Sequence, residues 1–208
     1  MPLGFDEARK LIGRNTMLGE ARLRALYAAI VAADARGSTG CIVEAGCYRG
    51  GSAALAALAS SVEREIWLFD SFQGMPAPTG DDPDRTEASR HTGRFSVTPE
   101  HVLDFYAAWG LSQRVRIVPG WFTDTLPCPG VPPIALLHVD ADWYDGTKRA
   151  LEAFYPLVEP GGTIQIDDYG HWKGCCKATD AFLLREGIRS PLTAVDYTAH
   201  QLVKGSIG

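Results

Sequence analysis

Short apolar runs recur along the chain and several of them end in an acid or a glycine. The five clearest runs are 41–46 (CIVEAG), 65–70 (EIWLFD), 114–120 (RVRIVPG), 134–140 (IALLHVD) and 162–167 (GTIQID). Runs of this length without strict polar alternation are typical of central strands that are buried on both faces. The pattern therefore predicts a parallel sheet.

Helical stretches fill the gaps between these runs. Segment 15–36 places apolar residues at helical spacing, and Gly37 follows where a helix would end. Further helices are expected at 52–61, 98–111, 146–158 and 175–187. Strands that alternate with helices form β-α units with right-handed crossovers. We therefore expect a doubly wound α/β fold.

Two regions depart from this alternation. Segments 192–197 and 199–205 alternate like paired strands and are too close together for a helical crossover, so we expect them to finish the sheet antiparallel. Region 74–98 is long, irregular and rich in Gly, Pro, Asp, Thr and Ser. It is either a mobile surface insertion without a role or a lid over the substrate, and we favour the lid.

Composition narrows the classes of protein that the chain can represent. Its 208 residues, 46% hydrophobic and 22% charged, suit one globular domain spanning 1–208. A net charge of -5 provides no basic field for nucleic acid or acidic lipid. The sequence also has neither the apolar start of a secretion signal nor an apolar run of roughly 18 residues, so we expect no membrane partner and a cytoplasmic protein.

The first predicted strand leads into a glycine-rich loop, VEAGCYRGGS. Gly46 and Gly50 permit a tight turn close to a ligand, and Ser52 could cap the next helix. The spacing is not the GxGxxG that holds a dinucleotide pyrophosphate. Glu44 would repel phosphates but could attract the amino group of a methionine moiety. The loop favours S-adenosylmethionine over NAD, although such turns also occur without a ligand.

Two further features belong to the same edge of the predicted sheet. Asp70 closes the second strand about 20 residues after the loop, where an acid can accept hydrogen bonds from both ribose hydroxyls, unless it only caps a turn. After the third strand, Gly120 precedes Trp121 and Phe122. Their rings could be flat apolar walls for adenine, or they could be ordinary core aromatics.

Two more strands end in pairs of acids, Asp140 with Asp142 and Asp167 with Asp168. If these strands are adjacent, the carboxylates come within a few ångströms, which is unfavourable without a cation. Oxygen-only ligands select a hard ion, magnesium or calcium. The alternative is that the acids cap the helices that follow them.

Such an ion would hold a substrate hydroxyl, lower its pKa and place it in line with a methyl sulfonium. Methyl transfer then needs a base. Asp140, between the metal and the substrate, is the first candidate, and Asp142 and His171 are alternatives.

Four strings in this order closely resemble the macrocin O-methyltransferase (TylF/MycF) family: LFDSFQGMP, GWFTDTLP, LLHVDADWYDGTKRALE and PGGTIQIDDYGHW. The resemblance spans roughly residues 15–205. It implies a Rossmann-like class I methyltransferase fold, with a mostly parallel seven-stranded sheet and an antiparallel C-terminal strand. It also implies a metal-dependent enzyme that methylates sugar hydroxyls on macrolides and related natural products, acting as a homo-oligomer that is at least a dimer.

The resemblance also assigns roles by position. Asp140, Asp167 and Asp168 would be the magnesium ligands, and Asp140 would also be the general base. Residues that match the adenosylmethionine pocket, or lie in the same strand-end loops, are Glu44, Gly46, Tyr48, Gly50, Ser52, Asp70, Ser71, Gly120, Trp121 and Phe122.

The sequence thus predicts an S-adenosylmethionine- and Mg²⁺-dependent O-methyltransferase acting on a small hydroxylated substrate, a glycosylated secondary metabolite. A catechol or phenol acceptor is the nearest alternative, but related phenol methyltransferases often place a lysine where this chain has Ala141, Asp142 and Trp143. An NAD-dependent oxidoreductase is disfavoured by the absent GxGxxG and by the lack of an evident hydride-transfer Tyr and Lys pair. A noncatalytic adenosylmethionine-binding module is the third alternative.

Overall fold

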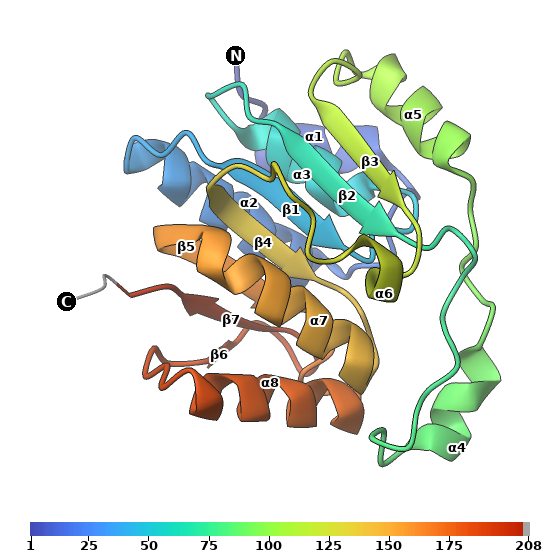
Figure 1. The fold of residues 1–208 in the computed structure, drawn as a ribbon. Helices are drawn as coiled ribbons and strands as arrows, with labels where there is room; N and C mark the ends of the chain where they lie inside the picture. The colour runs from blue at the N-terminus through green and yellow to red at the C-terminus, as the bar shows by residue number, and fades with distance from the viewer. Residues whose placement is uncertain (206–208) are drawn as a thin grey trace.

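A seven-stranded sheet forms the centre of the protein in a computed structural model that describes residues 1–205 (Figure 1). The strand order is β3-β2-β1-β4-β5-β7-β6. The strands are β1 (Cys41–Ala45), β2 (Ile66–Asp70), β3 (Val115–Pro119), β4 (Ile134–Val139), β5 (Val158–Ile166), β6 (Thr193–Ala194) and β7 (His200–Val203). Strands β1 to β5 pair in parallel, whereas β7 is antiparallel to both β5 and β6. The predicted sheet, with its antiparallel C-terminal end, is confirmed.

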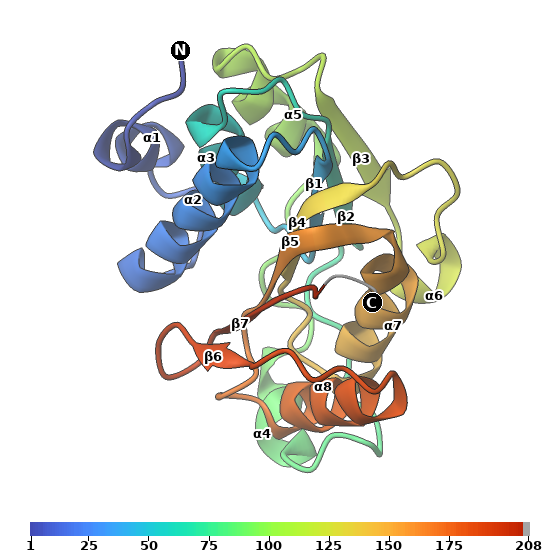
Figure 2. The same cartoon turned by 90° about the vertical axis from the view of Figure 1, so that its left-hand side faces the viewer.

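Helices cover both faces of this sheet (Figures 1 and 2). The helices are α1 (Phe5–Ile12), α2 (Glu20–Ala35), α3 (Gly51–Ala59), α4 (Arg85–Ala88), α5 (Pro99–Ala108), α6 (Phe122–Thr125), α7 (Tyr144–Phe154) and α8 (Lys173–Arg185), with 3-10 turns η1 (Ser89–His91) and η2 (Tyr155–Leu157). Helices α1, α2, α3 and α5 share one hydrophobic core with the sheet, and α7 and α8 share the other.

Alternation along the strands creates these two cores. Neighbouring β1 residues Ile42 and Val43 point to opposite faces and belong to different cores, and both are at most 1% exposed. Successive side chains of a strand alternate between faces, so a strand covered by helices on both sides must be apolar throughout. The continuous apolar runs in the sequence have this cause.

The helix predicted at 15–36 is shorter than expected and has a second helix before it. The predicted segment becomes α2, and α1 was not predicted. Gly13, with φ of 53°, ends α1, and the turn that follows packs on the loop after β1, where the Gly51 N–H donates to the Asn15 carbonyl at 2.9 Å. This long-range contact joins the segment between α1 and α2 to the first residue of α3.

The carboxyl ends of four parallel strands meet at one edge of the sheet. The register pairs Ala45 with both Phe69 and Val139, and Val139 with Ile166. The residues that follow these positions, Gly46, Asp70, Asp140 and Asp167, therefore lie side by side. This edge is where ligands bind in open α/β sheets.

Region 74–98 is irregular, as predicted, but includes α4 and η1 and lies beyond this edge (Figure 1). It is tied to the first turns of two helices. Asp82 is 3% exposed and accepts from the Tyr144 N–H of α7 at 2.8 Å, while Asp84 accepts from the Lys173 N–H of α8 at 3.0 Å. Carboxylates suit the unpaired N–H groups and the positive dipole end of a helix. The role of this region as a lid stays a prediction.

Residues 1–205 include no helix that is both long enough and apolar enough to cross a membrane.

Candidate functional site

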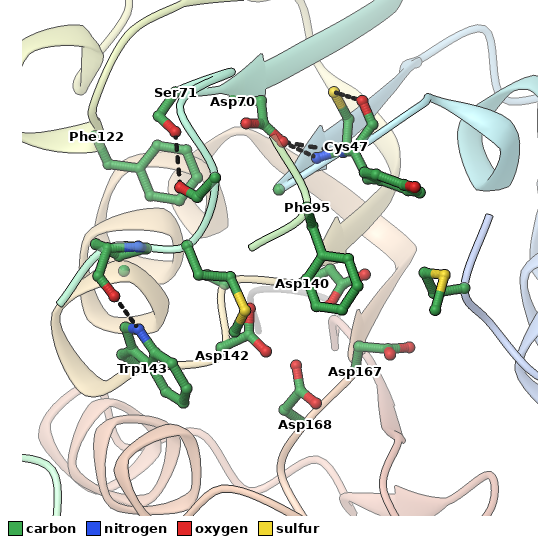
Figure 3. Close-up of a pocket in the computed structure, with 18 of the residues that line it drawn as sticks. Cys47, Asp70, Ser71, Phe95, Phe122, Asp140, Asp142, Trp143, Asp167 and Asp168 are labelled. Carbon is green, nitrogen blue, oxygen red and sulfur yellow. Dashed lines mark hydrogen bonds between the residues drawn. The ribbon is translucent and has the colours of Figure 1, made fainter. Parts of the chain in front are cut away.

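A cavity of about 510 Å³ opens at the carboxyl edge of the sheet (Figure 3). Its wall contains most of the predicted site residues: Gly46, Tyr48, Ser52, Asp70, Ser71, Gly120, Trp121, Phe122, Asp140, Asp167 and Asp168. Two predicted residues, Glu44 and Gly50, are outside this wall. The cavity has two ends, one around Asp70 and one around the other aspartates.

Asp70 is held by the backbone of the neighbouring loops. Its Oδ2 accepts from the N–H groups of Cys47 and Tyr48, both at 2.9 Å, and its Oδ1 accepts from the Phe72 N–H at 2.8 Å. Tyr48 and Phe72 adopt positive φ values of 49° and 58°, which are uncommon for residues with side chains and occur often at functional sites. An ionised carboxylate has about four lone-pair positions, so Asp70 can still accept from a ligand.

The two glycines of the first loop have different tasks. A Cβ on Gly46, whose φ is 87°, would lie 1.8 Å from the Asp140 carbonyl oxygen, so only glycine fits between β1 and β4 there. Gly50 turns the chain into α3 with φ of 75°, and a Cβ there would lie 2.8 Å from the ring of Tyr106. Gly50 therefore shapes the loop from behind the cavity wall.

Glu44 is fully buried below the cavity. Its carboxylate accepts from the Ser52 hydroxyl and contacts His138 Nδ1 at 2.7 Å. The register that pairs Glu44 with His138 on β4 brings the two side chains together. Both partners contact Oε1, whereas Oε2 is buried without a hydrogen-bond partner among residues 1–205. The contact of Glu44 with the amino group of a ligand stays a prediction.

Apolar residues form the rest of the Asp70 end of the cavity. Gly120, Trp121 and Phe122 line it at the end of β3, and Phe122 is the first residue of α6. The sequence analysis missed Met75 and Phe95, which reach the wall from region 74–98. The available signal was that both are large apolar side chains in an otherwise polar segment.

Four carboxylates gather at the other end (Figure 3). One oxygen each from Asp140, Asp142 and Asp168 lie within 4.8 Å of one another, and the same holds for ligand atoms of His138, Asp140 and Asp167. The structure thus brings together the four strand-end acids that the sequence singled out.

Burial and mutual repulsion oppose ionisation of these acids. Burial, followed by the charges of Asp167 and Asp168, raises the pKa of Asp140 well above its usual value. Burial and the charge of Asp167 raise the pKa of Asp168 to about 7. Burial and the charge of Asp168 likewise raise the pKa of Asp142. A nearby cation would reverse this balance.

Asp167 differs from its neighbours because donors surround it. Arg22 of α2 donates to its Oδ2, and the side chains of His138 and Gln165 lie 3.3 and 3.4 Å from its Oδ1. Burial alone would lower the pKa of His138, but hydrogen bonds to Asp167 and Glu44 outweigh it and raise that pKa well above its usual value. The sequence analysis missed His138. It could have been noticed as a polar residue inside an apolar strand.

The chemistry of this cluster suits a hard divalent cation. Asp168 is 9% exposed, and its Oδ2 is buried without a hydrogen-bond partner among residues 1–205. Buried charged oxygens are strongly destabilising when unpaired. Oxygen donors of this kind are the ligands that magnesium or calcium takes.

The rim of the cavity carries exposed aromatic and apolar side chains. Met17, Phe95 and Tyr197 line the cavity and are 63%, 39% and 76% exposed, and His171 lies beside Tyr197 with ring centroids 6.1 Å apart. Among the residues that line the cavity there is no lysine within the described part of the chain. Trp143 is buried, and its indole N–H donates to the Pro76 carbonyl at 2.8 Å.

Known sequences resemble this chain over most of its length. The family described as Macrocin-O-methyltransferase (TylF) matches residues 9–204. One relative, from Streptomyces olivaceus, is 8-demethyl-8-(2,3-dimethoxy-alpha-L-rhamnosyl)-tetracenomycin-C 4'-O-methyltransferase. It is 35% identical over 207 residues, which cover 93% of this chain and 79% of that protein. Mycinamicin III 3''-O-methyltransferase of Micromonospora griseorubida is 34% identical over 192 residues, covering 88% and 75%.

Among solved structures, the O-methyltransferase NovP superposes with a TM-score of 0.83 at 30% identity, covering 92% of this chain and 83% of that one. The similarity therefore extends over most of the fold.

Proposed function

Because the chain belongs to the macrocin O-methyltransferase (TylF) family, we propose that it methylates a hydroxyl group of a sugar on a natural product, using S-adenosylmethionine and Mg²⁺. The family and the relatives establish that it is an S-adenosylmethionine-dependent O-methyltransferase and remove the oxidoreductase alternative. The acceptor, the metal and the individual residue roles are the proposal.

At the Asp70 end, the proposed cofactor site uses the carboxylate of Asp70 to accept from the ribose hydroxyls. Its three backbone hydrogen bonds support this role, because they fix the carboxylate at the cavity edge before a ligand arrives. Trp121 and Phe122 would contact the adenine ring, and Gly46 lets the loop pass close to the methionine part. Tyr48, Ser52, Ser71 and Gly120 would line the same site.

At the acid end, Asp140, Asp167 and Asp168 are the proposed magnesium ligands. The main support for a metal is that Asp168 Oδ2 is buried without a hydrogen-bond partner and lies near other acids whose pKa values are raised. A bound Mg²⁺ would polarise the acceptor hydroxyl and lower its pKa.

Asp140 is the proposed general base, because it lies between the strand-end loop of the cofactor site and the remaining acids. The acceptor oxygen would form a bond to the methyl carbon while the bond from that carbon to sulfur breaks, which leaves S-adenosylhomocysteine. The hydroxyl proton would pass to the Asp140 carboxylate.

A sugar acceptor is favoured over a catechol by two observations. No lysine lines the cavity within residues 1–205, and buried Trp143 stands in the stretch where related phenol methyltransferases often have one. The exposed rings of Phe95 and Tyr197 at the rim offer flat apolar faces, which suit the nonpolar face of a sugar or a hydrophobic aglycone. The names of the relatives refer to a rhamnosyl tetracenomycin and to mycinamicin.

An acceptor panel tests this assignment. Purified protein with S-adenosylmethionine and Mg²⁺ is offered glycosylated polyketides, their aglycones and catechols, and S-adenosylhomocysteine formation is measured. We expect turnover with glycosides alone. Methylation of catechols but of no glycoside would contradict the sugar assignment, and so would the absence of turnover with every glycoside despite adenosylhomocysteine binding. A homo-oligomer stays a prediction, for which light scattering is the direct measurement.

A further inference from the structure

Tyr197 is the most exposed Phe, Tyr or Trp residue in the cavity wall, at 76%. It is the middle residue of the turn that joins β6 to β7. A single exposed ring on a protein surface needs no explanation. The position of this one at a cavity, on a turn that other residues hold in place, makes it a candidate for ligand binding.

Hydrogen bonds within the turn fix its backbone. The Oδ1 atom of Asp196 accepts from the N–H groups of Thr198 and Ala199 at 2.9 and 2.8 Å. The Val195 N–H donates to the Ala199 carbonyl at 2.8 Å and closes the turn. Aspartate side chains stabilise turns in this way. The turn therefore presents Tyr197 on an ordered backbone, which lowers the entropic cost of binding a ligand there.

The turn is also tied to the loop that follows β5. The Gly170 N–H donates to the Thr198 carbonyl at 2.7 Å. A Cβ on Gly170 would lie 2.1 Å from the Tyr197 carbonyl oxygen, so only glycine permits this close approach. Gly170 comes two residues after Asp168. The backbone of the turn thus packs beside the loop that carries acids of the cluster.

Arg22 makes a second connection between the turn and the acids. It donates to Asp167 Oδ2, and its Nε lies 3.3 Å from Asp196 Oδ2. One guanidinium therefore joins the end of β5 to the residue that precedes Tyr197. Both connections place Tyr197 at the acid end of the cavity, where the acceptor hydroxyl would be activated.

The protein itself leaves much of this ring uncovered. Among the aromatic rings of residues 1–205, His171 alone contacts Tyr197, with an interplanar angle of 87°. Phe95 differs, because it is 39% exposed and packs on Tyr48 with ring centroids 5.8 Å apart. Tyr197 is therefore the aromatic residue at the acid end that has the most surface free for a ligand.

We infer that the acceptor sugar stacks on the ring of Tyr197, which makes Tyr197 a determinant of acceptor affinity. One face of a pyranose consists largely of C–H groups and packs well on an aromatic ring. The hydroxyls stand at the edge of the sugar, so stacking leaves them free to reach the acids. This inference rests on the proposed function, because it requires a glycosylated acceptor.

Steady-state kinetics with a rhamnosylated aromatic polyketide test the role of the ring. Y197A and Y197N both remove it, and each should raise the acceptor KM about 10-fold. Their kcat should stay within about 2-fold, since the ring neither takes the proton nor binds the metal. Y197F and Y197W keep a ring and should retain a KM close to that of the unchanged protein.

Controls separate acceptor binding from structural support. L184A removes a side chain of α8 that is 85% exposed and is outside the cavity wall, so its KM should not change. S-adenosylhomocysteine affinity should stay unchanged in Y197A. Binding of Mn²⁺, which replaces Mg²⁺ for electron paramagnetic resonance, should also stay unchanged. If Y197A lost either of these as strongly as it lost acceptor affinity, Tyr197 would be a structural residue and the inference would be wrong.

Saturation-transfer difference NMR with the same glycoside identifies the part of the acceptor that the ring contacts. We expect the C–H protons of the sugar to receive strong saturation in the unchanged protein and less in Y197A. If the aglycone protons lost saturation instead, the ring would contact the aglycone and the sugar assignment would be wrong.

Two further results would overturn the inference in distinguishable ways. If the unchanged protein methylates no glycoside, the proposed function fails and the role of Tyr197 fails with it. If the unchanged protein methylates the glycoside and Y197A does so with the same KM, only the role of Tyr197 fails. A lower mass of Y197A in light scattering would then assign the ring to a contact between subunits.

Discussion

The two ends of the cavity both place aspartates at the carboxyl ends of strands, but the surroundings of those aspartates differ. Asp70 accepts hydrogen bonds from three backbone N–H groups, which fix its carboxylate at the cavity edge. Asp140, Asp142 and Asp168 converge, Asp168 buried and the other two partly buried, and their pKa values are raised. The first arrangement suits an acceptor of hydrogen bonds from a neutral ligand, whereas the second calls for a cation.

The largest expected effect comes from removing the base at the acid end. Asp140→Asn should lower kcat by about 10² to 10⁴-fold, because the amide cannot accept the hydroxyl proton. Its affinity for S-adenosylhomocysteine, measured by calorimetry, should change little, since that binding belongs to the Asp70 end. Full turnover in this variant would remove Asp140 from the mechanism.

Asp70→Asn tests the opposite end. The loss of a charged acceptor should weaken S-adenosylhomocysteine binding by about 10- to 100-fold, as expected for hydrogen bonds to a charged group worth about 1.5–3 kcal/mol. Mn²⁺ binding without the cofactor should be retained. If Asp70→Asn removed Mn²⁺ binding and left the cofactor affinity intact, the assignment of the two ends would be reversed.

The raised pKa of Asp168 makes a pH prediction for the metal-free protein. Its pKa is about 7 in the folded state against 3.8 for an ordinary aspartate, so its contribution to stability is present below about 4 and is lost as the pH rises to 7. The Tm of the chelated protein should therefore fall more steeply over this range than that of Asp168→Asn. If Tm fell with the same slope in both proteins, the pKa of Asp168 would not be raised in the folded state.

The smallest effect is expected where region 74–98 is attached to α7. Asp82→Ala removes the bonds to the Thr79 and Tyr144 N–H groups and should cost about 1–2 kcal/mol of unfolding free energy. Limited proteolysis should cut this region faster, while Mn²⁺ binding stays unchanged. Asp81→Ala is the control, because Asp81 is exposed and, among residues 1–205, its carboxylate pairs with Lys177 alone. Equal proteolysis of both variants would contradict an anchoring role for Asp82.

The sequence allowed prediction of the residues at the strand ends, because parallel strands bring their carboxyl ends to one edge. That rule sufficed for Asp70, Asp140, Asp167 and Asp168. It could not predict the contact of Glu44 with His138, which depends on the register between β1 and β4.

Contacts made by distant segments were also beyond the sequence pattern. The cap that Asp82 provides to α7 joins residues 62 positions apart, and the walls formed by Met75 and Phe95 depend on how region 74–98 packs. The helix α1 was not predicted, because it is only eight residues long and packs on α2 and α3, contacts that the local pattern does not reveal.

The central claim is that a cation at the acid end activates the acceptor hydroxyl. The most direct test measures methyl transfer to a glycosylated acceptor, first with the protein in chelator and then after Mg²⁺ is added. The account predicts no turnover in the chelator, recovery with Mg²⁺, and S-adenosylhomocysteine affinity that persists throughout. Full turnover in excess chelator would contradict it.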